Sequence, residues 1–317
     1  MPGYPDYIDE DIAYLLGAII ARGEIIEQSD ELIVTIRYPY RYLQIDEVTD
    51  IPTKISVGLD YIVNRFKKLG FDVTKNFDLK NPRQGASLQL ATKAGSIEAR
   101  VIKYHLNNKQ TYREFEIPKT LWDAPENVVR EFIRGFADVA GHIRRSNRDT
   151  NGFNRVYLDV LFSNWKLPVQ LCNLMMMKLN VPVSVITWAH PNIRDPNLRH
   201  VNDNSWWKKE HQIKIYAHNF TSIGFYIPYK QEHLEKLAKE NIEMLNNGMR
   251  PSQHEKCNGI IRITNEKRKA SHPGENDPEL PSEIRGIHFD SYKQICRALG
   301  CRLISNNEIT RWLSGST

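Results

Sequence analysis

Two segments of the chain carry the same pair of glycines, and this repetition constrains the fold more than any other feature of the sequence. The first segment, AYLLGAIIARGEI, contains Gly17 and Gly23, and the second, EFIRGFADVAGHI, contains Gly135 and Gly141 at the same offsets. Both segments space their apolar residues as a helix does until the second glycine is reached. A glycine inside a helix costs about 1 kcal/mol relative to alanine, so each helix needs a structural reason to keep one.

The sequence that follows each glycine pair repeats as well. After the first pair, residues 23–39 alternate as a β-hairpin, and residues 55–73 have the pattern of a helix followed by a strand. After the second pair, residues 142–163 and 164–186 predict the same two units in the same order. Further strand pairs are predicted at 86–105 and 210–217, and a helix at 231–246. The fold class is therefore α+β, with two pseudo-twofold copies of one unit.

The glycines themselves suggest how the copies meet. Two helices approach backbone to backbone only where side chains are missing, so Gly17 and Gly135 would form a tight helix seam. Gly23 and Gly141 end the helices, at the position where a left-handed conformation costs glycine little. The alternative is a pair of unrelated amphipathic core helices.

The residues around these glycines resemble a known family. LLGAIIARG and IRGFADVAG look like degenerate copies of the LAGLIDADG motif of homing endonucleases. IPKTLWDAPENVVREFIRGFAD resembles the lead-in to the second motif, and NFTSIGFYIPYKQEHLEKL resembles the end of the second half. The resemblance covers residues 8 to about 246. It implies two αββαββα halves, residues 1–118 and 119–250, that form a saddle with antiparallel sheets in the major groove of double-stranded DNA.

The same resemblance implies a chemistry that this chain has altered. The family needs one acidic residue directly before the last glycine of each motif, where two carboxylates hold a divalent metal ion. Magnesium suits such oxygen ligands, and it lowers the pKa of a bound water. Arg22 and Ala140 occupy these positions here, and neither ligates a cation.

Three other residues are the candidates if cleavage persists. Glu24 directly follows Gly23, and Asp138 matches the first acid of the family motif. These two carboxylates are the candidate catalytic and metal-binding groups. Asp138 lies two positions before the family's acid, which turns its side chain by about 200° away from the active face, so local capping or packing is the alternative for it. Lys214 is the candidate counterpart of the lysine that assists the chemistry in this family.

DNA binding does not depend on those acids, and residues suited to it lie on the predicted hairpins. Alternate residues of a strand share one face, and arginine pairs with guanine while glutamine and threonine also contact bases. The candidate DNA-binding residues are Gln28, Thr35 and Arg37 in the first copy and His142, Arg144, Arg145, Arg148, Arg155 and Tyr157 in the second. Arg83, Lys93, Arg100 and Lys103, expected on further strands, would extend the basic surface. The alternative is that these are the solvated faces of half-buried sheets.

Residues 251–317 differ in composition from the rest of the chain. The stretch NEKRKASHPGENDPELPSE is polar and contains prolines, as a linker does, and HFDSYKQICRALGCRLISNNEITRWL has two capped helical patterns around Gly300. This C-terminal module resembles the helix-turn-helix units appended to some homing endonucleases. A simple helical hairpin packed on the main body is the alternative.

The net charge and the hydropathy of the chain are compatible with a DNA-binding protein but do not by themselves indicate one. The formal net charge is +5, and the apolar run near the start is too short to span a bilayer and has no basic flank. We expect a cytoplasmic monomer that does not bind membranes. Two functions remain: a sequence-specific double-stranded DNA-binding protein that has lost cleavage, and a metal-dependent endonuclease of homing or restriction type that uses displaced acids. The first requires no cofactor and the second requires magnesium.

Overall fold

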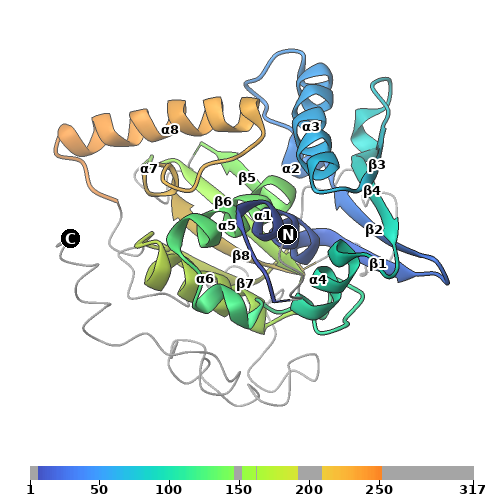
Figure 1. Cartoon of the computed structure of the whole chain (residues 1–317). Coiled ribbons are helices and arrows are strands. Elements are labelled where there is room, and N and C mark those ends of the chain that lie inside the picture. Colours follow the sequence, from blue (N-terminus) through green and yellow to red (C-terminus); the bar gives the residue numbers. More distant parts are fainter. Residues whose placement is uncertain (1–5, 146–151, 162, 192–208, 252–317) are drawn as a thin grey trace.

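A computed structural model describes residues 6–145, 152–161, 163–191 and 209–251 (Figure 1). Within these residues the protein is α+β and contains two four-stranded antiparallel sheets. The fold class predicted from the sequence is therefore confirmed at this level. The predicted Arg148 and the C-terminal module beyond residue 251 lie outside the described residues.

The first sheet follows the first glycine pair. Its strands pair in the order β1-β2-β4-β3, and the predicted hairpin of β1 and β2 is confirmed. The elements of this part are α1 (Glu10–Arg22), β1 (Gly23–Glu27), β2 (Glu31–Tyr38), α2 (Tyr40–Leu43), α3 (Ile51–Lys68), β3 (Asp72–Phe77), η1 (Pro82–Gln84), β4 (Ala86–Lys93), α4 (Ile97–His105) and η2 (Lys119–Trp122).

The second sheet follows the second glycine pair and repeats this order as β5-β6-β8-β7. The predicted pairing of β5 with β6 is confirmed, as is the helix that follows it. The elements are α5 (Glu126–Ala140), β5 (Gly141–Arg144), β6 (Arg155–Leu161), α6 (Lys166–Lys178), β7 (Val185–Pro191), β8 (Lys209–Tyr216), α7 (Ala217–Phe220) and α8 (Pro228–Asn246).

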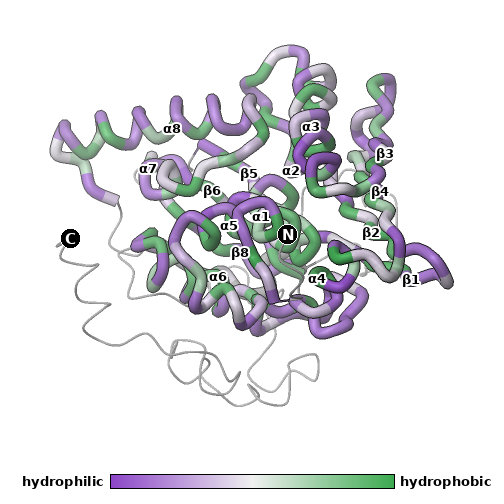
Figure 2. The backbone as a smooth tube through the Cα atoms, in the orientation of Figure 1, coloured by the Kyte–Doolittle hydropathy of each residue, from purple (hydrophilic) through white to green (hydrophobic). Residues whose placement is uncertain are grey.

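Helices α1 and α5 lie against each other in the centre of the molecule, where Figure 2 shows hydrophobic residues along α1. A Cβ atom on Gly17 would lie 2.0 Å from the carbonyl oxygen of Phe132, and one on Gly135 would lie 2.1 Å from the carbonyl oxygen of Tyr14. No side chain fits at either place. The two glycines thus allow the helix backbones to touch, which is the reason for keeping them.

The glycines that end these helices have a different role from the one expected. Gly23 and Gly141 both have extended backbones, with φ of −91° and −102°, so the left-handed conformation predicted for them is wrong. These positions require glycine because there is no room for a side chain. A Cβ atom on Gly23 would lie 2.6 Å from the carbonyl oxygen of Ile19, and one on Gly141 would lie 2.4 Å from that of Ala137.

One predicted strand is a helix. Residues 97–105 were expected to pair with 86–93, but they form α4. Ser96 caps this helix, because its side chain accepts a hydrogen bond from the amide of Ala99. β4 pairs instead with β2 and β3, so Arg100 and Lys103 are helix residues and not sheet residues. No helix in the described part of the chain is long and apolar enough to cross a membrane.

Candidate nucleic-acid interface

The end of α1 carries an arginine that is buried among partners from distant parts of the chain. Arg22 is 6% exposed and donates hydrogen bonds to Glu210 Oε1 at 2.9 Å and to the Tyr42 hydroxyl at 3.2 Å. It also donates to the carbonyl oxygens of Ala21 and Asp159. The guanidinium therefore joins the end of α1 to the second sheet.

A second arginine completes this group. Arg41 of α2 forms an ion pair with the same carboxylate oxygen of Glu210 and hydrogen bonds to the Tyr42 hydroxyl. Tyr42 in turn contacts both oxygens of Glu210 at 3.2 Å. We call Arg22, Arg41, Tyr42, Asp159 and Glu210 the central cluster. Its two arginines come from the N-terminal part of the chain and its two acids from β6 and β8.

Asp159 is the member of the central cluster whose carboxylate is least well hydrogen-bonded, since its Oδ1 has no hydrogen-bond partner among the described residues. Its side chain is buried, and Oδ2 lies 3.8 Å from Nδ1 of His142. Burial, and after it the charge of Glu210, raise the pKa of the Asp159 carboxyl to about 7 against the opposing charges of Arg41 and Arg22. Asp159 is therefore partly protonated near neutral pH.

The two acids proposed from the sequence do not come together. Glu24 lies on an exposed face and pairs with Arg37 at 2.8 Å. Asp138 is fully buried, and its carboxylate accepts hydrogen bonds from the Tyr14 hydroxyl at 2.7 Å and from the amides of Tyr226 and Ile227. Asp138 thus ties α5 to α1 and to the segment before α8, which is the local packing role that was the alternative to a catalytic and metal-binding one.

A buried lysine supports this arrangement. Lys230 donates to the carbonyl oxygens of Asp138 at 3.0 Å and Gly141 at 2.9 Å, at the C-terminal end of α5. Burial lowers the pKa of Lys230 to about 8, while the charge of Asp138 acts to raise it. Among the described residues, no three His, Cys, Asp or Glu side chains gather in a way that could hold a metal ion.

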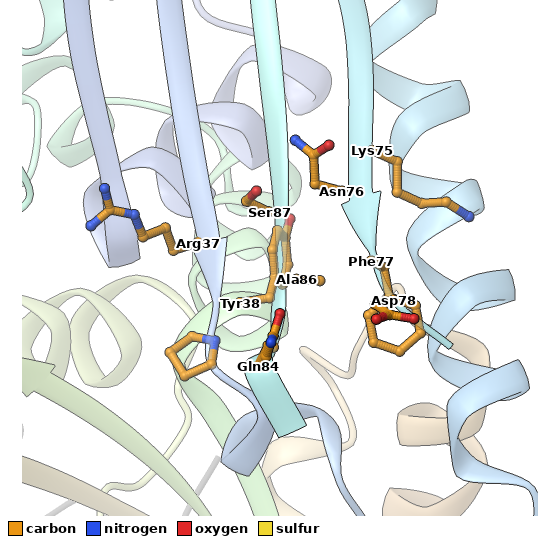
Figure 3. A pocket seen from close by; sticks show the side chains of 11 residues that line it. Arg37, Tyr38, Lys75, Asn76, Phe77, Asp78, Gln84, Ala86 and Ser87 are labelled. Carbon is orange, nitrogen blue, oxygen red and sulfur yellow. The ribbon is translucent and has the colours of Figure 1, made fainter. Parts of the chain in front are cut away.

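One face of the first sheet is exposed and polar. Strand pairing places Glu24, Thr35, Gln89 and Thr74 in one row across the sheet. The next row contains Arg37, Ser87 and Asn76 (Figure 3), which line an open hollow of about 800 Å³. Lys75 points the other way, toward α3, where it pairs with Asp60. These rows contain several side chains that can hydrogen-bond to base edges.

The same face of the second sheet is mostly buried. His142, Arg155 and Asp159 are 4%, 2% and 3% exposed. His142 stacks on the ring of Tyr157 at 4.9 Å, and Arg155 lies over the ring of Tyr216. Both side chains are buried and lie against aromatic rings, so neither is exposed at this face, and their assignment to DNA binding stays a prediction.

The remaining predicted residues have varied surroundings. Gln28 is exposed in the turn between β1 and β2, while Arg144, Tyr157 and Lys214 are half-buried, and the Lys214 ammonium lies 5.7 Å from the centre of the Tyr157 ring. Arg145 is exposed and pairs with Glu47 and Glu240. It therefore links the loop before α3 to α8, a contact that the sequence did not predict.

Sequence reasoning missed Arg41, Tyr42 and Glu210. None of them lies in a motif, and Glu210 is 188 residues from Arg22. The available signal was Arg22 itself, since an arginine at the end of an apolar helix requires a buried counter-charge.

Comparison with known proteins adds a partial match. No family model matches the chain. The chain is 21% identical over 196 residues to a protein described as a probable translation initiation factor IF-2 from Methanocaldococcus jannaschii. The match covers 59% of this chain and 15% of that protein, so the chain spans only a small part of that protein's length.

Proposed function

We propose that this protein binds double-stranded DNA in a sequence-specific manner, as a LAGLIDADG-like protein that no longer cleaves it. The repeat of the two sheets supports this proposal. Gly23 pairs with Ile36 and Gly141 with Leu158, so each strand that leaves the helix seam meets its partner in the same way. The pairs Thr35 with Gln89 and Tyr157 with Lys214 continue the correspondence across the sheets.

The loss of cleavage rests on one observation, which is the burial of Arg22 in the central cluster. Arg22 holds the position at which the family places a metal-binding acid, and its guanidinium is bound by Glu210. A permanent cation there opposes a second cation, since arginine stays charged at all relevant pH values. The matching position in the other copy is Ala140, which is fully buried and has no ligand atom.

The binding surface on this proposal is asymmetric. The exposed face of the first sheet offers Thr35, Arg37, Gln89, Thr74 and Asn76 to the major groove. The corresponding face of the second sheet is mostly buried, with only Tyr157 and Lys214 of its central row half-buried, so it does not offer the same contacts. We therefore assign base recognition chiefly to the first sheet.

Selection from a random duplex library, followed by incubation of the recovered duplexes with Mg²⁺ or Mn²⁺, tests the proposal. We expect enrichment of a defined sequence and no strand cleavage. Cleavage that depends on the metal and disappears in Glu24→Ala would contradict the loss of cleavage and favour the endonuclease. A Glu243→Ala variant, which changes an exposed acid on α8 away from this face, serves as the control. Failure to enrich any duplex would contradict DNA binding itself.

A further inference from the structure

An apolar row lies beside the polar rows on the exposed face of the first sheet. Ile26 pairs with Ile33, and Ile33 pairs with Ala91, so three neighbouring strands place apolar side chains side by side. Ile26 is 56% exposed, while Ile33 and Ala91 are half-buried. A single exposed isoleucine needs no explanation, but a row of apolar groups between polar ones indicates a contact surface.

The spacing of these rows matches the spacing of base pairs. Residues on one face of a strand lie about 6.7 Å apart along the strand, while bases follow each other every 3.4 Å or so. Adjacent rows therefore lie about two base pairs apart if the strands run along the groove. A major groove about 12 Å wide admits a two-stranded ribbon such as the β1–β2 hairpin, whose strands are about 4.8 Å apart, and β4 lies directly beside β2.

The charges at the ends of the sheet suit a polyanion. Arg83 lies in η1, three residues before β4 begins, and Lys93 ends β4; both side chains are exposed. Cations at both ends of the strand that crosses the middle of the face are placed to meet the phosphates on either side of a groove. Exposed acids also lie here, Glu31 opposite Lys93 and Asp72 opposite Ala91, so it is the placement of the two cations, and not the net charge of the face, that favours DNA over an apolar protein surface as the occupant.

We infer that the row of Ile26, Ile33 and Ala91 contacts the 5-methyl groups of thymines in the major groove. The thymine methyl is an apolar group at the edge of a base pair there, and aliphatic side chains recognise it by contact. The thymines lie about two base pairs from the bases that Thr35 and Gln89 contact. This inference rests on the proposed DNA binding and adds the base type and its position.

Replacement of thymine by deoxyuridine tests the inference, because it removes the methyl group and leaves base pairing and phosphates unchanged. The probe is the duplex enriched from the random library, made once with dT and once with dU. Burial of one methyl group is worth about a fourfold change in affinity, so we expect wild-type protein to prefer the dT duplex by about that factor for each contacted thymine. Single dU substitutions then locate the thymines relative to the position that Gln89→Ala affects.

Two variants separate the outcomes. Ile26→Ser should bind the dT and dU duplexes with more nearly equal affinity. Ile242 of α8 is exposed to a similar extent, 48% against 56% for Ile26, and Ile242→Ser should keep the wild-type preference. Equal binding of both duplexes by wild-type protein would overturn the inference and leave DNA binding intact. A change of oligomeric state in Ile26→Ser without a change in the dT preference would assign the row to a protein contact and overturn it too. Failure to bind any duplex would overturn both proposals.

Discussion

Replacing Gly17 with alanine perturbs the helix seam with the smallest possible side chain. The added methyl carbon would lie 2.0 Å from the carbonyl oxygen of Phe132, which is backbone and cannot rotate away. Atoms in contact lie about 3.5 to 4 Å apart, so α1 and α5 must separate by more than about 1 Å.

The expected cost follows from two opposing terms. Overpacking of a tight core costs up to about 3 kcal/mol when the neighbours cannot yield, and alanine regains about 1 kcal/mol of helix propensity. We therefore expect Gly17→Ala to lower the free energy of unfolding by about 2 kcal/mol, and Gly135→Ala to do the same. The two changes strain one interface, so the double variant should cost less than the sum.

Urea unfolding followed by circular dichroism measures this cost. Gly95→Ala is the matched control, because a Cβ atom at Gly95 meets nothing within 4 Å, and its stability should change little or rise slightly. The reasoning would be refuted if Gly17→Ala were about 1 kcal/mol more stable than wild type, which is the result for a helix with no close neighbour.

Three further predictions address the central cluster and its surroundings. Arg22→Met leaves the buried Glu210 with one arginine fewer, so it should lower the free energy of unfolding, measured in urea, by about 3 kcal/mol. No loss of stability would show that Arg22 and Glu210 do not form an ion pair. Burial raises the pKa of the Asp159 carboxyl to about 7, so the folded state holds a proton that the unfolded state releases above about pH 4. The free energy of unfolding should therefore fall as the pH rises from about 4 to 7. Asp159→Asn should flatten this slope in thermal unfolding, and an unchanged slope would contradict the assignment. Asp138→Ala removes the hydrogen-bond acceptor for the Tyr14 hydroxyl and two amides, so it should lower the free energy of unfolding by about 3 kcal/mol or more. Cleavage should be neither created nor abolished. A stable variant with altered cleavage would assign Asp138 a catalytic role.

Local sequence patterns were sufficient for the hairpins and helices that follow each glycine pair. Apolar and polar residues alternate along 31–38, and apolar residues have helical spacing along 51–68. Both patterns reflect burial of one face of the element and can be recognised from neighbouring residues alone. Residues 97–105 also space their apolar side chains as a helix does, but they were predicted as a strand paired with residues 86–93. The cap at Ser96 was the local signal for the helix.

The site was harder to predict because its contacts span the chain. Burial of His142 and Arg155 depends on what covers a sheet face, and alternation within a strand does not distinguish a solvated face from a covered one. The ion pair of Arg22 with Glu210 joins a helix end to a strand that begins far along the sequence. The local packing of Asp138, in contrast, was open to prediction, because two positions along the helix turn its side chain away from the direction of Ala140.

The most direct test of the account is the affinity of the selected duplex for wild-type protein and for Arg37→Ala. Arg37 lies on the exposed face of the first sheet, whereas Arg130 lies near the N-terminal end of α5 and provides the control Arg130→Ala. We predict salt-dependent, sequence-specific binding that Arg37→Ala weakens by about 1 to 3 kcal/mol and Arg130→Ala leaves unchanged. Equal loss in both variants, or no binding to any duplex, would contradict the assignment of the first sheet as a DNA-reading surface.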